Sequence, residues 1–150
     1  MSIKRIIYGL LSGLLIQTGF ATPPFEVLRS CIDEKPNTTS VHIKDIDNGT
    51  YSSKLEKNCE EKFEIIFKNK LYGAVVCNDR LDLIIDGQKI NIETAKNMSV
   101  NPEIKPGRLH PADSAWLKID FNDESYLCIN GPLSREGKGS AVDQYYIVEH

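Results

Sequence analysis

The chain has 150 residues, a formal net charge of −3 and a hydrophobic fraction of 41%, values typical of one ordinary globular domain. Its mild acidity argues against a protein that binds nucleic acid, because such a protein needs a basic surface. It also argues against attraction to anionic membrane surfaces. The composition therefore favours a domain that acts on proteins or small molecules.

The first 21 residues predict a cleavable signal peptide. Lys4 and Arg5 precede an apolar run over 6–16, and Gly19 and Ala21 supply small residues at the −3 and −1 positions of a cut after Ala21. The run is shorter than the roughly 20 apolar residues that a membrane-spanning helix requires, and no second such stretch follows. Losing Lys4 and Arg5 would lower the formal charge from −3 to −5. We expect a domain over 22–150 with no membrane span after cleavage, located in the periplasm or secreted.

All four cysteines, Cys31, Cys59, Cys77 and Cys128, follow this segment, and an even count in an exported chain predicts disulfides. Four cysteines allow three pairings, and spacing alone does not select among them. We expect Cys31 to pair with Cys59 and Cys77 to pair with Cys128. A zinc site is disfavoured because no CxxC pair occurs and no histidine has ligand spacing to a cysteine. The sequence predicts neither a metal nor a cofactor.

The remaining chain reads as a short helix followed by strands. Within 22–34, Phe25, Leu28 and Ile32 fit one face of a helix, whereas Phe25, Val27 and Cys31 would fit a strand, and we favour the short helix. Apolar and polar residues then alternate with a period of two, which predicts paired strands, and Asn-Gly, Asp-Gly and similar pairs predict the turns between them. The predicted hairpins lie at 41–44 with 51–55 around Asn48-Gly49, at 63–68 with 71–77 around Asn69-Lys70, and at 81–86 with 90–92 around Asp86-Gly87.

The stretch over 93–114 contains three prolines and few apolar residues, and we read it as a candidate surface loop. Strands resume at 116–121, 126–129 and 145–148, with a second loop at 130–142. About nine short strands at hairpin spacing predict a mainly β fold. The expected architecture is a single-domain antiparallel β-sandwich or small barrel with a short N-terminal helix.

The loop over 131–140 superficially resembles a phosphate-binding loop, but its spacing is wrong. Five residues separate Gly131 from the Gly137-Lys138 pair, where that motif has four, and a glycine follows the lysine instead of Ser or Thr. Charged side chains on a loop of a rigid β scaffold often carry recognition. The candidate binding residues are therefore Ser134, Arg135, Glu136 and Lys138, and the alternative is a plain solvated connection between two strands.

No GxSxG motif occurs, and His110 beside Asp113 is the one histidine in a plausible catalytic setting. We therefore expect a non-enzymatic binding protein, best described as an inhibitor or immunity-type protein whose partner is an exported hydrolase or toxin. One alternative is a small secreted hydrolase with a site around His110, Asp113 and the acidic turn over 120–124. Another is a structural envelope subunit that assembles through edge strands.

Overall fold

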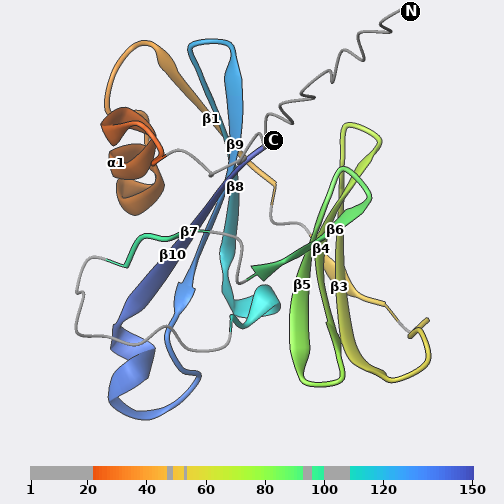
Figure 1. Cartoon of the computed structure of the whole chain (residues 1–150). Coiled ribbons are helices and arrows are strands. Elements are labelled where there is room, and N and C mark those ends of the chain that lie inside the picture. Colours follow the sequence, from red (N-terminus) through yellow and green to blue (C-terminus); the bar gives the residue numbers. More distant parts are fainter. Residues whose placement is uncertain (1–21, 47–48, 53, 93–95, 100–108) are drawn as a thin grey trace, which may run out of the picture.

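The computed structural model describes residues 22–46, 49–52, 54–92, 96–99 and 109–150, so the expected signal peptide lies outside the described residues. Within these ranges two antiparallel sheets of five strands each face one another, and one helix covers the outer side of the first sheet (Figure 1). The predicted antiparallel β-sandwich with a short N-terminal helix is confirmed. The strands form two separate sheets, not one closed barrel.

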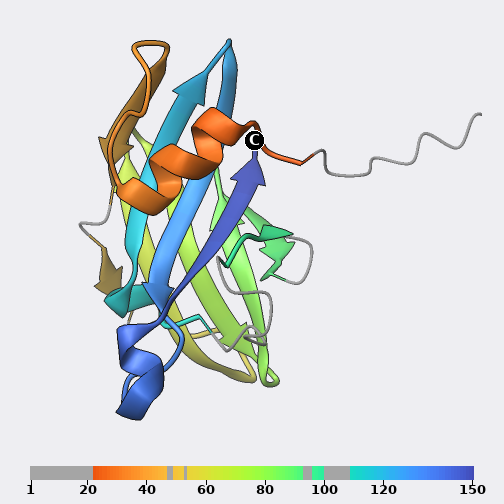
Figure 2. The ribbon, with the colours of Figure 1, turned by 90° about the vertical axis from the view of Figure 1, so that its left-hand side faces the viewer.

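The first sheet, sheet A, lies between the helix and the second sheet. Its strand order is β1 (Val41–Asp45), β8 (Ala115–Phe121), β9 (Glu124–Pro132), β10 (Asp143–Glu149) and β7 (Lys96–Asn97). Helix α1 (Phe25–Asp33) crosses its outer face (Figure 2). Sheet B has the order β2 (Thr50–Tyr51), β3 (Cys59–Phe67), β4 (Lys70–Cys77), β5 (Arg80–Ile85) and β6 (Gln88–Asn91).

Two-residue turns join consecutive strands in both sheets. The turn residues are Lys68-Asn69, Asn78-Asp79, Asp86-Gly87 and Asn122-Asp123, and all of them have positive φ. A tight hairpin turn of this kind requires positive φ at both central positions, which Asn, Asp and Gly tolerate best. The predicted hairpins β3–β4 and β5–β6 are confirmed, although the β3–β4 turn lies one residue earlier than the predicted Asn69-Lys70. The predicted strands at 116–121 and 126–129 form a further hairpin, β8–β9.

The hairpin predicted around Asn48-Gly49 is wrong, and Asn48 itself lies outside the described residues. Strand β1 pairs with β8 in sheet A, whereas β2 pairs with β3 in sheet B and ends at Tyr51. Ile46 is buried between the sheets, and its amide donates to the carbonyl of Trp116 at 2.8 Å. The chain therefore passes from one sheet to the other at this point.

The central strands of sheet A are buried on both faces. Trp116 points into the core between the sheets, whereas its neighbour Leu117 points toward α1. Tyr146 likewise points into the core between the sheets, and Tyr145 points toward α1, so both tyrosines are buried. The fold therefore has three layers, α1, sheet A and sheet B, with one apolar core on each side of sheet A.

The predicted disulfide pairing is wrong, although all four cysteines are bonded. Cys31 of α1 pairs with Cys128 of β9, and Cys59 pairs with Cys77 across the β3–β4 hairpin. Their Cα atoms lie 5.8 and 3.9 Å apart, within the reach that a disulfide requires. The pairing follows from the topology, because α1 lies over the face of sheet A toward which Cys128 points. The same bond fixes the buried face of the helix, so Phe25 is 67% exposed instead of facing the core as predicted.

Candidate functional site

The candidate recognition loop, defined here as residues 133–142, connects β9 to β10 at one end of the sandwich (Figures 1 and 2). It contains the short 3-10 helix η3 (Gly137–Ala141). Arg135, Glu136 and Lys138 are exposed, whereas Ser134 is half-buried. The four candidate binding residues predicted from sequence therefore share one projecting segment.

Hydrogen bonds within the recognition loop hold its backbone in one conformation. The Ser134 hydroxyl donates to the carbonyl of Glu136 at 2.6 Å and accepts from the Glu136 amide at 3.1 Å. The Leu133 amide donates to the carbonyl of Val142 at 2.7 Å and closes the base of the loop. A Cβ atom at Gly139 would lie 2.8 Å from Cβ of Ser134, so a glycine is needed for this close approach. A loop ordered in this way loses little conformational entropy on binding.

Arg135 connects the recognition loop to two other parts of the fold. Its Nε donates to Oδ2 of Asp113 at 2.7 Å, and its Nη2 donates to the hydroxyl of Tyr51 at 3.4 Å. Asp113 ends the 3-10 helix η2 (Pro111–Asp113), and Tyr51 comes from β2 in sheet B. The hydrogen bond that Arg135 donates to Asp113 is the main cause that raises the pKa of Arg135, so the guanidinium stays charged.

The Arg135 cluster, meaning Arg135 with Asp113 and Tyr51, could not be identified from the sequence. The sequence marked Arg135 as a binding residue and Asp113 as a catalytic candidate, but it gave no sign that they meet. Tyr51 carried no functional signal, because an aromatic residue in a predicted strand is more often a packing residue. In the structure Tyr51 is 50% exposed and stacks edge-on against Phe63 with ring centroids 5.7 Å apart. The cluster therefore presents a cation beside an aromatic ring.

The alternative hydrolase site requires His110, Asp113 and the acidic turn to converge. Asp113 is bound by Arg135, and the His110 carbonyl accepts hydrogen bonds from the Asp113 amide and the Ser114 hydroxyl. The acidic turn follows the far end of β8, whose 7 residues begin next to η2. An extended strand of this length spans roughly 20 Å. The structure does not bring the residues of this hypothesis together.

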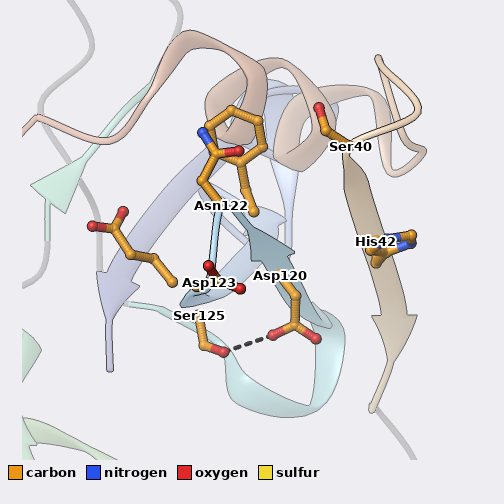
Figure 3. Close-up of a pocket in the computed structure, with 8 residues that line it drawn as sticks. Ser40, His42, Asp120, Asn122, Asp123 and Ser125 are labelled. Atoms are coloured by element: carbon orange, nitrogen blue, oxygen red, sulfur yellow. Dashed lines mark hydrogen bonds between the residues drawn. The ribbon is translucent and has the colours of Figure 1, made fainter.

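A polar pocket of about 500 Å³ lies at that far end, between β1 and the β8–β9 turn (Figure 3). The Ser125 hydroxyl donates to Oδ1 of Asp120 at 2.6 Å, and it accepts from Lys118 Nζ at 3.1 Å. Lys118 also forms an ion pair with Asp120. The residues labelled around the pocket are Ser40, His42, Asp120, Asn122, Asp123 and Ser125.

Serine, histidine and aspartate occur together in this pocket, but not in a nucleophilic arrangement. A serine nucleophile needs a base that accepts its proton. The Ser125 proton is directed at Asp120. Desolvation raises the pKa of Asp120, but hydrogen bonds from Lys118 and Ser125 leave it below its usual value, so this carboxylate is a weak base. His42 lies opposite Asp120 in the β1–β8 register, but none of the side-chain hydrogen bonds between described residues joins the His42 ring to Asp120 or Ser125.

Two further features concern only the part of the chain that the structure describes. It contains no group of three or more His, Cys, Asp or Glu side chains placed to hold a metal ion. None of its helices combines the length and the apolar composition needed to cross a bilayer. Comparisons with protein families, with curated proteins and with solved structures gave no match to this chain.

Proposed function

We propose that the chain is an exported binding protein whose recognition loop carries Arg135 into a site on a protein partner. The narrower proposal is an inhibitor or immunity-type protein of the bacterial periplasm, with an exported hydrolase or toxin as its partner. The observation that carries the proposal is the Arg135 cluster. It holds an exposed, charged side chain of an internally bonded loop in place.

The chemistry of the Arg135 cluster suits a protein interface. Arg and Tyr are enriched among the residues that dominate binding energy at interfaces. A guanidinium has five N–H donors, and the bonds to Asp113 and Tyr51 use two of them. Positioning Arg135 before the partner arrives reduces the entropy cost of binding. The two disulfides add support for export, because such bonds persist in oxidising compartments.

The shape of the recognition loop supports the inhibitor proposal. Catalytic sites of hydrolases are concave, and a projecting ordered loop is complementary to such a site. Arg135, Glu136 and Lys138 place charges of both signs on this loop, which suits a polar cleft better than a flat apolar interface. The proposal therefore predicts that binding blocks the partner's activity.

Site-specific photo-crosslinking from the disulfide-bonded protein in an envelope extract tests the binding site. A photoreactive residue at Lys138 should give a defined adduct with one protein, and Arg135→Ala in the same chain should abolish that adduct. The matched control places the photoreactive residue at Asp123, which is exposed at the opposite end of the sandwich. An adduct from position 123 but not from 138, or one unaffected by Arg135→Ala, would refute the assignment of the loop.

Titration of the purified partner with this protein tests the inhibitor proposal separately. The wild-type protein should reduce the partner's hydrolytic or toxic activity at a 1:1 ratio. Arg135→Ala should weaken the affinity about 30-fold or more, as expected for loss of an arginine worth about 2 kcal/mol. A partner that crosslinks to position 138 but keeps full activity would leave the binding role standing and reject the inhibitor role.

A further inference from the structure

A second cavity, of about 320 Å³, lies between the two sheets at the end of the sandwich opposite the recognition loop. It is formed where the β3–β4 and β5–β6 turns of sheet B approach β8, the start of β9 and His150, the residue that follows β10. Its walls include Phe67, Lys68, Lys70, Tyr72, Lys118 and His150. We call this space the inter-sheet cavity.

Positive charge gathers around the inter-sheet cavity, although the chain as a whole is acidic. Lys68, Lys70 and Lys118 line it, and the ammonium group of Lys44 in β1 lies near enough to Lys68 to lower the pKa of Lys68. Asp86 forms an ion pair with Lys70 at 2.6 Å, and Asp120 forms one with Lys118. None of the ion pairs between described residues joins Lys44 or Lys68 to an acid. Lys68 is therefore the lining lysine that no ion pair between described residues neutralises.

The contact between Lys44 and Lys68 is unfavourable without a counter-charge. Two ammonium groups at this separation repel each other, and the neighbouring Lys44 accordingly lowers the pKa of Lys68. Lys68 is exposed, and its ammonium lies 5.6 Å from the centre of the Phe67 ring at the mouth of the cavity. An anion between these lysines would convert the repulsion into two charge-assisted contacts.

A hydroxyl group and aromatic rings complete the walls. The Ser125 hydroxyl reaches the cavity from β9, and the His150 ring packs edge-on against Tyr72 with centroids 5.9 Å apart. The volume lies at the lower end of the roughly 300–1,000 Å³ typical of small-molecule sites. It therefore has room for an anionic group with a small organic substituent packed against the rings.

We propose that the inter-sheet cavity binds a tetrahedral oxyanion of the phosphate or sulfate class, held by Lys44, Lys68 and Lys118. Lysine ammonium groups are point charges that bind such anions from several directions without a fixed planar geometry. The oxyanion is either a free ion or the anionic group of a small organic ester. This site does not depend on the recognition loop or on the proposed protein partner.

Titration of the isotope-labelled, disulfide-bonded protein, followed by amide chemical shifts at constant ionic strength, tests the proposal. Inorganic phosphate, inorganic sulfate and glycerol 3-phosphate are the probes, and sodium chloride is the control. Saturable shifts at Tyr72, Lys118 and Ser125 are expected with at least one probe and not with chloride. Tighter binding of glycerol 3-phosphate than of both inorganic ions identifies an organic ester as the ligand, and the reverse identifies a free ion.

Lys68→Gln should weaken binding about tenfold or more, since a hydrogen bond to a charged group contributes about 1.5–3 kcal/mol. Lys57→Gln removes the same charge from an exposed position of the β2–β3 connection and should leave binding unchanged. In sodium chloride without a probe anion, Lys68→Gln should raise the midpoint temperature of unfolding, because the repulsion between Lys44 and Lys68 is removed. This measurement also shows whether the variant folds. Equal loss of binding in both variants, a lower midpoint for Lys68→Gln, or no saturable shift with any probe would overturn the proposal.

Discussion

The two disulfides should contribute unequally to stability, because they close loops of very different length. The sequence separation is 97 residues for Cys31–Cys128 and 18 residues for Cys59–Cys77. On the chain-entropy model these loops correspond to about 4.7 and about 3.2 kcal/mol of stabilisation at 25 °C. Replacing both cysteines of one bond by alanine should therefore cost about 1.5 kcal/mol more in Cys31→Ala/Cys128→Ala than in Cys59→Ala/Cys77→Ala.

The burial of the cysteines also predicts a larger loss of stability when the Cys31–Cys128 bond is removed. Cys31 and Cys128 are fully buried in the core under α1, so alanine also leaves a small cavity there, whereas Cys59 and Cys77 are half-buried. Urea unfolding at 25 °C measures the difference. The free energies extrapolated to water should be compared instead of the midpoints, because removing a cross-link expands the denatured state and changes the slope. If the short-loop variant loses as much stability as the long-loop variant, the entropic reasoning fails for this fold.

Three further predictions follow from particular contacts. A double-mutant cycle of Arg135→Ala and Asp113→Ala on unfolding should give a coupling below about 1 kcal/mol, since this ion pair is exposed; a larger value would assign Arg135 mainly to stability. Gly73→Ala should lower the free energy of unfolding in urea by at least about 2 kcal/mol, because a Cβ at Gly73 would lie 2.0 Å from a backbone oxygen of β3 and the φ of Gly73 is +149°. Gly87→Ala is the control and should lower it clearly less, because Gly87 has a φ of +80° but open space around the added Cβ. Burial, and then Lys118 and Lys70, lower the pKa of His150 from 6.5, so the unfolded state binds this proton more tightly. The contribution of His150 to the free energy of unfolding should be complete above about pH 6.5 and be lost as the pH falls through the pKa of His150 in the folded state. His150→Asn should flatten this part of the plot of stability against pH, and an unchanged plot would contradict the assignment of this pH dependence to His150.

Local sequence pattern predicted the hairpins but not the partition of strands between the sheets. Alternation around Asp86-Gly87 identified β5 and β6, because both strands and their turn lie within one short segment. Asn48-Gly49 carries the same turn signal, yet the strands beside it belong to different sheets. A turn signal reports local backbone preference, whereas strand pairing depends on which partner buries more apolar surface. The burial of Ile46 beside Trp116 is such a long-range contact.

For the two sites as well, local features could be predicted from the sequence, whereas contacts between distant parts of the chain could not. The recognition loop was predicted because its charged residues are contiguous in sequence. The contacts of Arg135 with Asp113 and Tyr51 join residues 22 and 84 positions away, and no short motif reports them. The lysines of the inter-sheet cavity come from β1, the β3–β4 hairpin and β8, so they meet only after both sheets have formed.

The two proposed sites lie at opposite ends of β8, and this placement predicts that they act independently. Asp113, which holds Arg135, precedes β8, whereas Lys118 and Asp120 lie toward the other end of the strand. Perturbations at sites more than about 10 Å apart that share no partners usually add without coupling. Between the two ends lies a packed core that includes Trp116 and Ile129, and we expect such a core to act as a rigid spacer between the sites. Phosphate at saturation should therefore leave the affinity of the recognition loop for its partner unchanged within about twofold, measured by calorimetry. A larger change, lost in Lys68→Gln but kept in Lys57→Gln, would mean that the anion reorders the sandwich, and the assumption of a rigid scaffold would then be wrong.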